Sequence, residues 1–159
     1  MKKIYTRRFV IIPLLAILLM LTCSISASAV SDPQSVKEIK EETVLYADGS
    51  YDTITLTVST STARSSKTIS GTKTVTKHSA LNVTQYSFTV YGSFSYTGTS
   101  ATAIRASASY KIYESSWSCT GKTVEKSGNT VTGTATFKNG LSKNYPTATI
   151  TCSNTGVLS

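Results

Sequence analysis

Threonine alternates with aliphatic residues along several stretches of this chain, and this alternation restricts the fold more than any other feature. In YDTITLTVST (51–60), Ile54 and Leu56 stand at even positions with threonines at the odd positions between them. TVTGTATFK (130–138) and TATITCS (147–153) repeat the pattern. A period of two places alternate side chains on opposite faces of a β-strand. The chain is therefore predicted to be all-β, each strand burying one face.

Such one-sided strands bury their apolar faces by packing two sheets together. Ser and Thr supply 47 of the 130 residues that follow residue 29, and β-branched threonine favours strands. We expect an antiparallel two-sheet sandwich of about eight strands, Ig-like in outline although the immunoglobulin order of Cys, Trp and Cys is absent. The expected strands are 43–47, 51–60, 67–77, 83–97, 101–113, 117–125, 130–138 and 146–153.

Turn residues predict the register of two hairpins. A three-residue loop at 48–50 pairs Val44 with Ile54 and keeps both on the apolar face, whereas a two-residue loop would invert the face. A second loop at 98–100 brings the apolar faces of its two strands together. The pairs expected there are Phe94–Ile104, Gly92–Ala106, Val90–Ala108 and Phe88–Tyr110.

Residues 1–29 have the parts of a secretory signal peptide: a cationic head, an apolar run at 9–21 and small residues ending at Ala29. We expect cleavage after Ala29 and a secreted, extracellular protein. An uncleaved anchor is the alternative, but 13 apolar residues fall short of the roughly 20 that span a bilayer. Lipidation of Cys23 is a second alternative, for which the preceding Thr22 is a poor fit.

Residues 30–42 are predicted to be an acidic leader or a short helix preceding the sandwich domain at 43–159. Asp32 is a suitable cap and Pro33 suits a first helical turn. A helix of about ten residues is marginal alone, so a flexible leader is equally expected.

Two cysteines remain after the signal peptide, Cys119 and Cys152, and in an oxidising compartment they predict a disulfide. Trp117 lies two residues before Cys119 and would share its face of the strand, so we expect the indole to pack on that bridge. The chain lacks a C-x-x-C motif, and two cysteines with His78 are too few ligands for zinc.

No catalytic residues, metal ligands or cofactor are expected, and the protein is predicted not to be an enzyme. Beyond residue 52 the only acids are Glu114 and Glu125, and acid–base catalysis needs two carboxylates that converge. His78 lies in a polar stretch that is typical of a loop.

Residues 53–159 carry ten basic residues against those two acids, a net charge of +8. Anionic wall polymers or glycans are possible partners of a basic extracellular protein. No nucleic-acid partner is expected, and the basic residues occur singly rather than in runs. The alternative interpretation is that isolated lysines protect exposed strand edges.

Four residues form the candidate ligand surface, on the face opposite the predicted core: Tyr91, Arg105, Lys111 and Tyr113. Rings stack on sugar faces, and Arg or Lys binds acidic groups. Ordinary exposed residues of a wide sheet are the alternative interpretation.

Residues 117–156, with W-S-C, GNTVTGTATF and TATITCSNTG, resemble small secreted β-rich proteins of Gram-positive bacteria. The resemblance implies a secreted β domain and brings no catalytic residues with it. We expect a non-enzymatic cell-surface or extracellular module that binds a ligand or serves a structural role. The alternative is a membrane-active, toxin-like or antimicrobial effector, because strands 83–97 and 101–113 are long enough to cross a bilayer.

Overall fold

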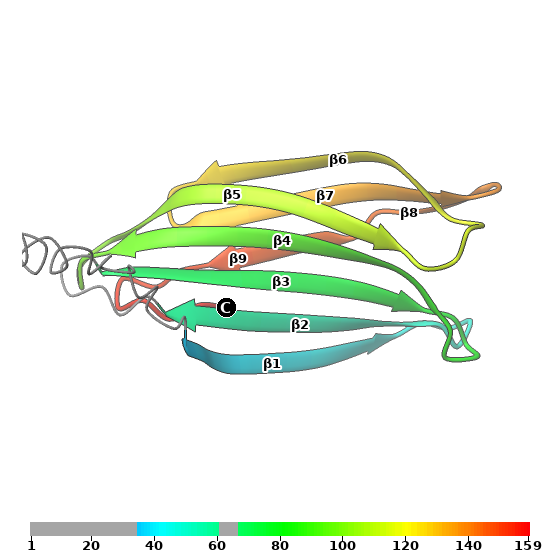
Figure 1. The fold of residues 1–159 in the computed structure, drawn as a ribbon, viewed down its shortest axis with the longest axis horizontal. Helices are drawn as coiled ribbons and strands as arrows, with labels where there is room; N and C mark the ends of the chain where they lie inside the picture. The colour runs from blue at the N-terminus through cyan, green and yellow to red at the C-terminus, as the bar shows by residue number, and fades with distance from the viewer. Residues whose placement is uncertain (1–34, 61–66) are drawn as a thin grey trace, which may run out of the picture. The chain divides into compact units, whose positions relative to one another are not determined.

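The computed structural model describes residues 35–60 and 67–159, and within them it contains nine β-strands (Figure 1). The expected signal peptide, its cleavage after Ala29 and residues 30–34 lie outside the described residues. The strands are β1 (Ser35–Leu45), β2 (Tyr51–Thr60), β3 (Thr68–His78), β4 (Thr84–Tyr96), β5 (Ala101–Ile112), β6 (Ser118–Ser127), β7 (Thr130–Asn139), β8 (Ser142–Asn144) and β9 (Thr147–Thr151).

These strands form two antiparallel sheets. The first sheet has the order β1-β2-β3-β4-β5. In the second sheet β7 pairs with β6 along one edge and with both β8 and β9 along the other. Strands β7 and β9 pack across β3, β4 and β5, as the two layers in Figure 1 show. The predicted all-β, two-sheet sandwich is confirmed. The Ig-like outline stays a prediction, since the first sheet is a simple meander.

The core lies between the two sheets, and a glycine on β7 allows the sheets to pack closely. Phe88 and Val90 of β4 face Val131 and Phe137 of β7, and all four side chains are fully buried. A Cβ added at Gly133 would collide with Val90. The missing side chain on β7 thus lets the sheets approach to the packing density that interiors require.

The N-terminal strand departs from the sequence-based expectation. Residues 35–42 continue β1 rather than forming a leader or a short helix. The reason is tertiary: β2 offers β1 a hydrogen-bonding partner along its whole length, whereas a ten-residue helix lacks comparable support. A second departure is the short strand β8, which was not predicted. Tyr145 and Pro146 separate β8 from β9 and interrupt the pairing with β7 between these two strands.

The first hairpin register was wrong. Val44 pairs with Asp52, and Ile54 pairs with Glu42. The Tyr46 N–H donates to the Ser50 carbonyl at 2.8 Å, so the three-residue loop comprises residues 47–49 rather than 48–50. Gly49 takes the left-handed conformation (φ 78°) that closes a loop of this kind.

The β4–β5 register is correct for three of the four expected pairs, which are Gly92–Ala106, Val90–Ala108 and Phe88–Tyr110. The fourth is wrong, because a bulge shifts the pairing and places Phe94 opposite Ala103. An extra residue on one strand reverses the faces beyond it. Ile104 is consequently exposed, and Ala103 is buried instead.

The disulfide expectation is contradicted, since Cys119 and Cys152 are both free thiols. Cys119 pairs with Phe137 at one end of β7, whereas Cys152 donates its N–H to Asn129 beside the other end. The seven residue steps from Thr130 to Phe137 span roughly 23 Å of strand. A disulfide requires Cα atoms about 4.4–6.8 Å apart, so these two sulfurs cannot meet in this fold.

Trp117 is buried as expected, but its partner is different. With no bridge present, the indole packs edge-on against the Tyr86 ring at a centroid distance of 5.1 Å. Tyr86 in turn stacks on Phe137 of the opposite sheet at 3.8 Å. An aromatic cluster therefore fills the space next to Cys119 that the disulfide was expected to occupy.

Candidate functional site: a polar cleft at one end of the sandwich

The four residues of the predicted ligand surface divide into two separate groups. Tyr91 is half-buried and donates its hydroxyl hydrogen to Ser70 Oγ at 3.2 Å, and exposed Arg105 lies near it on β5. Lys111 and Tyr113 lie at the far end of β5, with the ammonium 4.7 Å from the ring centroid. Six residue steps from Arg105 to Lys111 span roughly 20 Å. They share a side of the sheet but form no single site.

Hydroxyl groups cover the sheet between these two groups. Thr55, Thr74, Thr89 and Ser109 stand opposite one another on four adjacent strands, and the hydroxyls of Thr74 and Thr89 are 3.0 Å apart. Cross-strand threonine pairs of this kind stabilise a sheet by about 0.2–1 kcal/mol each. The hydroxyl face thus has a structural explanation and needs no ligand to account for it.

A different location breaks the pattern of the sandwich. At the end of the first sheet the core-facing positions of β2 and β3 are occupied by Asp52 and Lys77, and Lys73 is a further, less buried lysine on this face of β3. Lys77 is only 8% exposed. A buried charge is costly unless it is paired, and pairs of this kind occur often in functional sites.

The ammonium of Lys77 is held by three partners. Its Nζ lies 3.7 Å from Asp52 Oδ1, donates to Ser50 Oγ at 2.9 Å, and sits 3.8 Å from the centroid of the Tyr46 ring. The Ser50 hydroxyl donates onward to Asp48 Oδ1 at 2.6 Å. The loop between β1 and β2 is thereby tied to the end of β3 by a continuous polar network.

Two tyrosines beside this network have raised pKa values. The Tyr46 hydroxyl donates to Asp52 Oδ2 at 2.6 Å, and this hydrogen bond to a carboxylate is the main cause that raises the pKa of Tyr46 to about 12. Burial raises the pKa of Tyr86 to about 12 as well. Both phenols are therefore neutral hydrogen-bonding groups at physiological pH. Hydrogen bonds from Ser50 lower the pKa of Asp48, which stays ionised.

A cleft opens over the network, between the end of the first sheet and the β8 region of the second. It has two adjoining parts, of about 430 Å³ and about 290 Å³, which share Asp48, Ser50, Lys77 and Asn144. Rings line both parts: Tyr46, Tyr86 and Tyr145 in the larger one, Trp117 in the smaller one. The remaining lining residues are Ala47, Asp52 and Pro146 in the first part, and Ser79, Ala80, Gln85 and Ser142 in the second.

Two buried polar atoms at this cleft lack hydrogen-bond partners among the described residues. One is the indole N–H of Trp117, a side chain that is 8% exposed. The other is Asp52 Oδ1, which has only the 3.7 Å ion pair with Lys77. Such atoms are rare in native proteins, and each calls for a specific explanation. The residues that line the cleft therefore include one buried donor and one buried acceptor without a hydrogen-bond partner.

Sequence reasoning missed this site, although a signal was present. Asp52 precedes Ile54 and Leu56 at the same period of two, and Lys77 follows Ile69 and Val75 in the same way. A charged residue at an apolar position of a strand departs from binary patterning, and such departures concentrate at functional sites. Which residues of the opposite sheet line the cleft beside them depends on sheet packing, which the strand pattern does not reveal.

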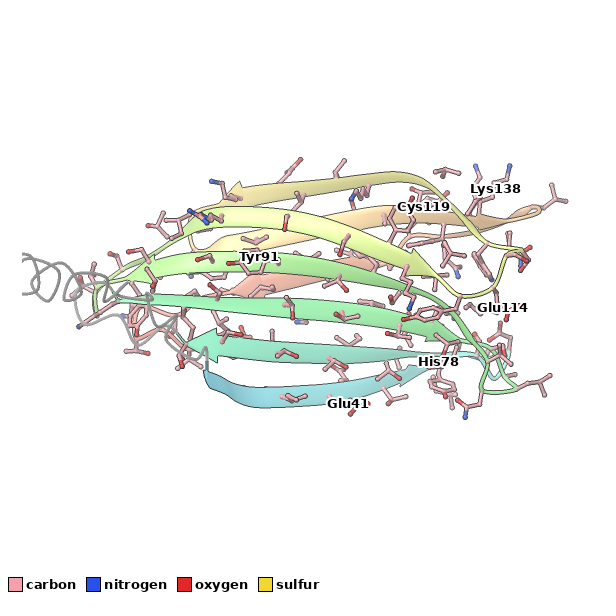
Figure 2. All side chains as sticks on the ribbon, viewed as in Figure 1. Glu41, His78, Tyr91, Glu114, Cys119 and Lys138 are labelled. Atoms are coloured by element: carbon pink, nitrogen blue, oxygen red, sulfur yellow. The ribbon has the colours of Figure 1, made fainter. Side chains whose placement is uncertain are left out.

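The residues considered for catalysis are not brought together. Glu114 lies in the loop between β5 and β6 (Figure 2). Glu125 pairs with Thr132 two residues before the end of β6. His78 ends β3, where its ring stacks on Tyr51 at 4.5 Å. Within residues 35–60 and 67–159, no group of three or more His, Cys, Asp and Glu residues is placed to hold a metal ion.

Comparisons with known proteins give no match. No family model matches the chain, and neither the curated proteins nor the solved structures contain a match. In the part of the chain that the structure describes, no helix is long and apolar enough to cross a membrane.

Proposed function

We propose that this protein is a secreted, non-enzymatic binding module and that the end cleft binds a neutral glycan. The observation that carries the proposal is the buried Lys77 network, which faces aromatic rings across a cleft whose lining residues include one buried donor and one buried acceptor without a hydrogen-bond partner. The signal-like sequence of residues 1–29 supports secretion.

The chemistry of the cleft favours hydroxyl-bearing ligands. A sugar hydroxyl both donates and accepts, so neighbouring hydroxyls match the Trp117 N–H and Asp52 Oδ1 together once the side chains lining the cleft adjust. Sugar rings present apolar faces to tyrosine and tryptophan. An anionic polymer fits less well, because the carboxylates of Asp48 and Asp52 outnumber the single ammonium of Lys77 among the lining residues.

Trp117 provides a direct test, because it is the only tryptophan in the chain. We expect its fluorescence to change in a saturable way when the mature protein is titrated with neutral oligosaccharides such as cellotriose, chitotriose or maltotriose. Replacing exposed Tyr145 with Ala should weaken the binding of whichever sugar responds by at least about fivefold, since removing a stacking ring costs roughly 1 kcal/mol.

Tyr113→Ala is the matched control, an exposed tyrosine at the same end that does not line the cleft. Its affinity for the sugar should equal that of the wild type. If the fluorescence response of Tyr145→Ala is identical to that of the wild type, the cleft is not the sugar-binding site. No response to any of the three sugars at millimolar concentration would reject the proposal.

One observation favours the alternative of a membrane-active protein: large apolar side chains are exposed on loops at the same end of the sandwich. Pore formation by β4 and β5 is not favoured. Phe88, Val90 and Phe94 of β4 are completely buried in the core, so insertion would require the sandwich to open. A docking role at a lipid surface requires no such opening.

A further inference from the structure

Large exposed apolar residues are concentrated at the end of the sandwich that carries the cleft. The β1–β2, β3–β4, β5–β6 and β7–β8 loops meet there (Figure 1). Leu141 is fully exposed, and Leu81 and Leu45 are 86% and 73% exposed. Of the 11 exposed large apolar residues in the described part of the chain, seven lie at this end: Leu45, Tyr46, Leu81, Val83, Tyr113, Leu141 and Tyr145.

Turn formation does not require these leucines, as the opposite end of the same molecule demonstrates. The described loops there are Thr-Gly-Thr-Ser (97–100), Gly-Asn (128–129) and Ser-Asn-Thr-Gly (153–156). Their only large apolar neighbour in an exposed position is Val157, which follows the last of them. Scattered exposed leucines are normal, but a group on several neighbouring loops marks an interaction surface. The asymmetry therefore points to a partner at one end only.

Two of the leucines stand on well-fixed loops. Leu81 lies in a loop closed by hydrogen bonds from Ser79 N to the Val83 carbonyl at 2.9 Å and from Asn82 N to the Ser79 carbonyl at 3.0 Å. Leu141 follows Gly140, whose left-handed φ of 56° forms the tight β7–β8 turn. Side chains presented on preorganised loops lose little conformational entropy when they bind.

The charges next to Leu141 indicate the nature of the partner. Lys138 of β7 and Lys143 of β8 stand directly opposite each other in the antiparallel ladder, and both are exposed. Like charges at opposed positions destabilise a sheet. Lys111 adds a third ammonium at this end, against the carboxylates of Asp48 and Glu114. An anionic surface that covers the β7–β8 turn would relieve the repulsion between the two opposed lysines.

We propose that this end of the sandwich docks on an anionic lipid bilayer, with Leu81 and Leu141 inserted among the acyl chains and Lys138 and Lys143 at the lipid phosphates. Tyr113 and Tyr145 lie at headgroup level, where amphipathic rings concentrate. The lysine stems reach along the apolar surface while their charges remain in water. The protein docks peripherally and stays folded. This proposal does not rest on glycan binding, and of the residues named for the two proposals only Tyr145 belongs to both.

Vesicle co-sedimentation tests the proposal with the mature protein. We expect binding to vesicles of phosphatidylcholine and phosphatidylglycerol (3:1) and at least tenfold weaker binding to pure phosphatidylcholine. Combined Leu81→Ser and Leu141→Ser substitutions should weaken binding to the mixed vesicles by at least tenfold, because two side chains no longer enter the hydrocarbon. Combined Lys138→Ser and Lys143→Ser substitutions should weaken it by about 25-fold, at about fivefold for each lysine.

The control combines Ile104→Ser and Val157→Ser, which removes two exposed apolar side chains that lie away from this end. This variant should bind as the wild type does. Equal loss in the control and in the leucine variant would overturn the assignment to this end, and so would absence of binding to either vesicle. Release of an encapsulated dye at the concentrations that give binding would replace peripheral docking with membrane disruption. Unchanged sugar titrations in the leucine variant would show that the two proposals are independent.

Discussion

At the scale of single residues, most of the unusual chemistry of this protein surrounds Lys77. Its ammonium is buried among Ser50, Asp52 and the Tyr46 ring, and these contacts come from β2 and from the loop between β1 and β2. In the sequence only Asp52 and Lys77 stand out, as charged residues at apolar positions of their strands. Their environment becomes informative only because the first hairpin places the 46–50 loop over the end of β3.

Tyr46 gives a direct measure of this environment. Because its pKa is raised to about 12 by the hydrogen bond to Asp52, it should remain neutral well above the usual pKa of about 10. We expect an ultraviolet titration of the mature protein to contain two tyrosines that ionise near pH 12, Tyr46 and Tyr86. Tyr46→Phe should remove one of them, and Asp52→Asn should lower the pKa of Tyr46.

The sign of the linked stability follows from these pKa values. A pKa that is higher in the folded state means that folding favours the protonated phenol. The contribution of both tyrosines is complete below about pH 10 and is lost as the pH rises towards about 12. A high-pH titration that is unaltered by Tyr46→Phe would contradict the hydrogen bond to Asp52.

At the scale of elements, the two sheets have complementary inner faces, and lysines fill hydrogen-bonding positions at their edges. Lys122 and Lys126 of β6 donate to the carbonyls of Ala108 and Ile104 on the edge strand β5, at 2.7 and 3.0 Å. Lys73 of β3 donates to the Thr149 carbonyl of β9 at 3.1 Å. Unpaired edge groups invite aggregation, and lysines at these places block it.

Gly133 tests the packing between the sheets. Gly133→Ala should lower the free energy of unfolding by about 1–3 kcal/mol, because the new Cβ overlaps Val90 on the facing strand. Urea unfolding measures the change. In the double variant with Val90→Ala, the cost should be smaller than the sum of the two single costs, since the truncated side chain leaves room for the methyl group.

Gly121→Ala is the control for this substitution. Gly121 lies in β6, next to β7, and a Cβ there meets nothing within 4 Å. Its effect should stay within about 0.5 kcal/mol. If the two substitutions lower the free energy of unfolding equally, the loss comes from the conformational preference of the strand and not from contact between the sheets.

At the scale of the whole molecule, the sandwich is held together by its core without a covalent cross-link in the described residues. Cys119 lies at the end that carries the cleft, and Cys152 lies near the opposite end. Burial raises the pKa of the Cys152 thiol, which further disfavours the reactive thiolate.

We therefore expect the thermal midpoint of the mature protein to be the same with and without dithiothreitol. Loss of a native disulfide from a small domain typically costs about 2–5 kcal/mol, which would be visible as a shift of several degrees. Alkylation of the unfolded protein without reductant should modify both cysteines. If both cysteines of the unfolded protein resist alkylation until a reductant is added, the assignment of free thiols is wrong.

Strand periodicity alone predicted most of the fold. The expected strands 51–60, 101–113 and 130–138 match β2, β5 and β7 to within one residue at each end. The prediction succeeds because alternate residues of a half-buried strand face the core and the solvent. This alternation is a local property of the chain. The expected strand 43–47 covers only the end of β1, and its first part was missed for the opposite reason: residues 35–42 lack a strong alternation and become a strand only because β2 pairs with them.

The candidate site depended on distant contacts throughout. A bulge at Phe94 exposed Ile104. In the first hairpin the loop moved by one residue, which shifted the pairing by two and placed Asp52 opposite Val44. Sequence determined which residues alternate, and hence that two apolar sheet faces must meet. Tertiary structure alone decided that Lys77 and Trp117 share a cleft while Cys119 and Cys152 stay apart, because these distances depend on register and on sheet packing, to which residues far apart in the chain contribute together.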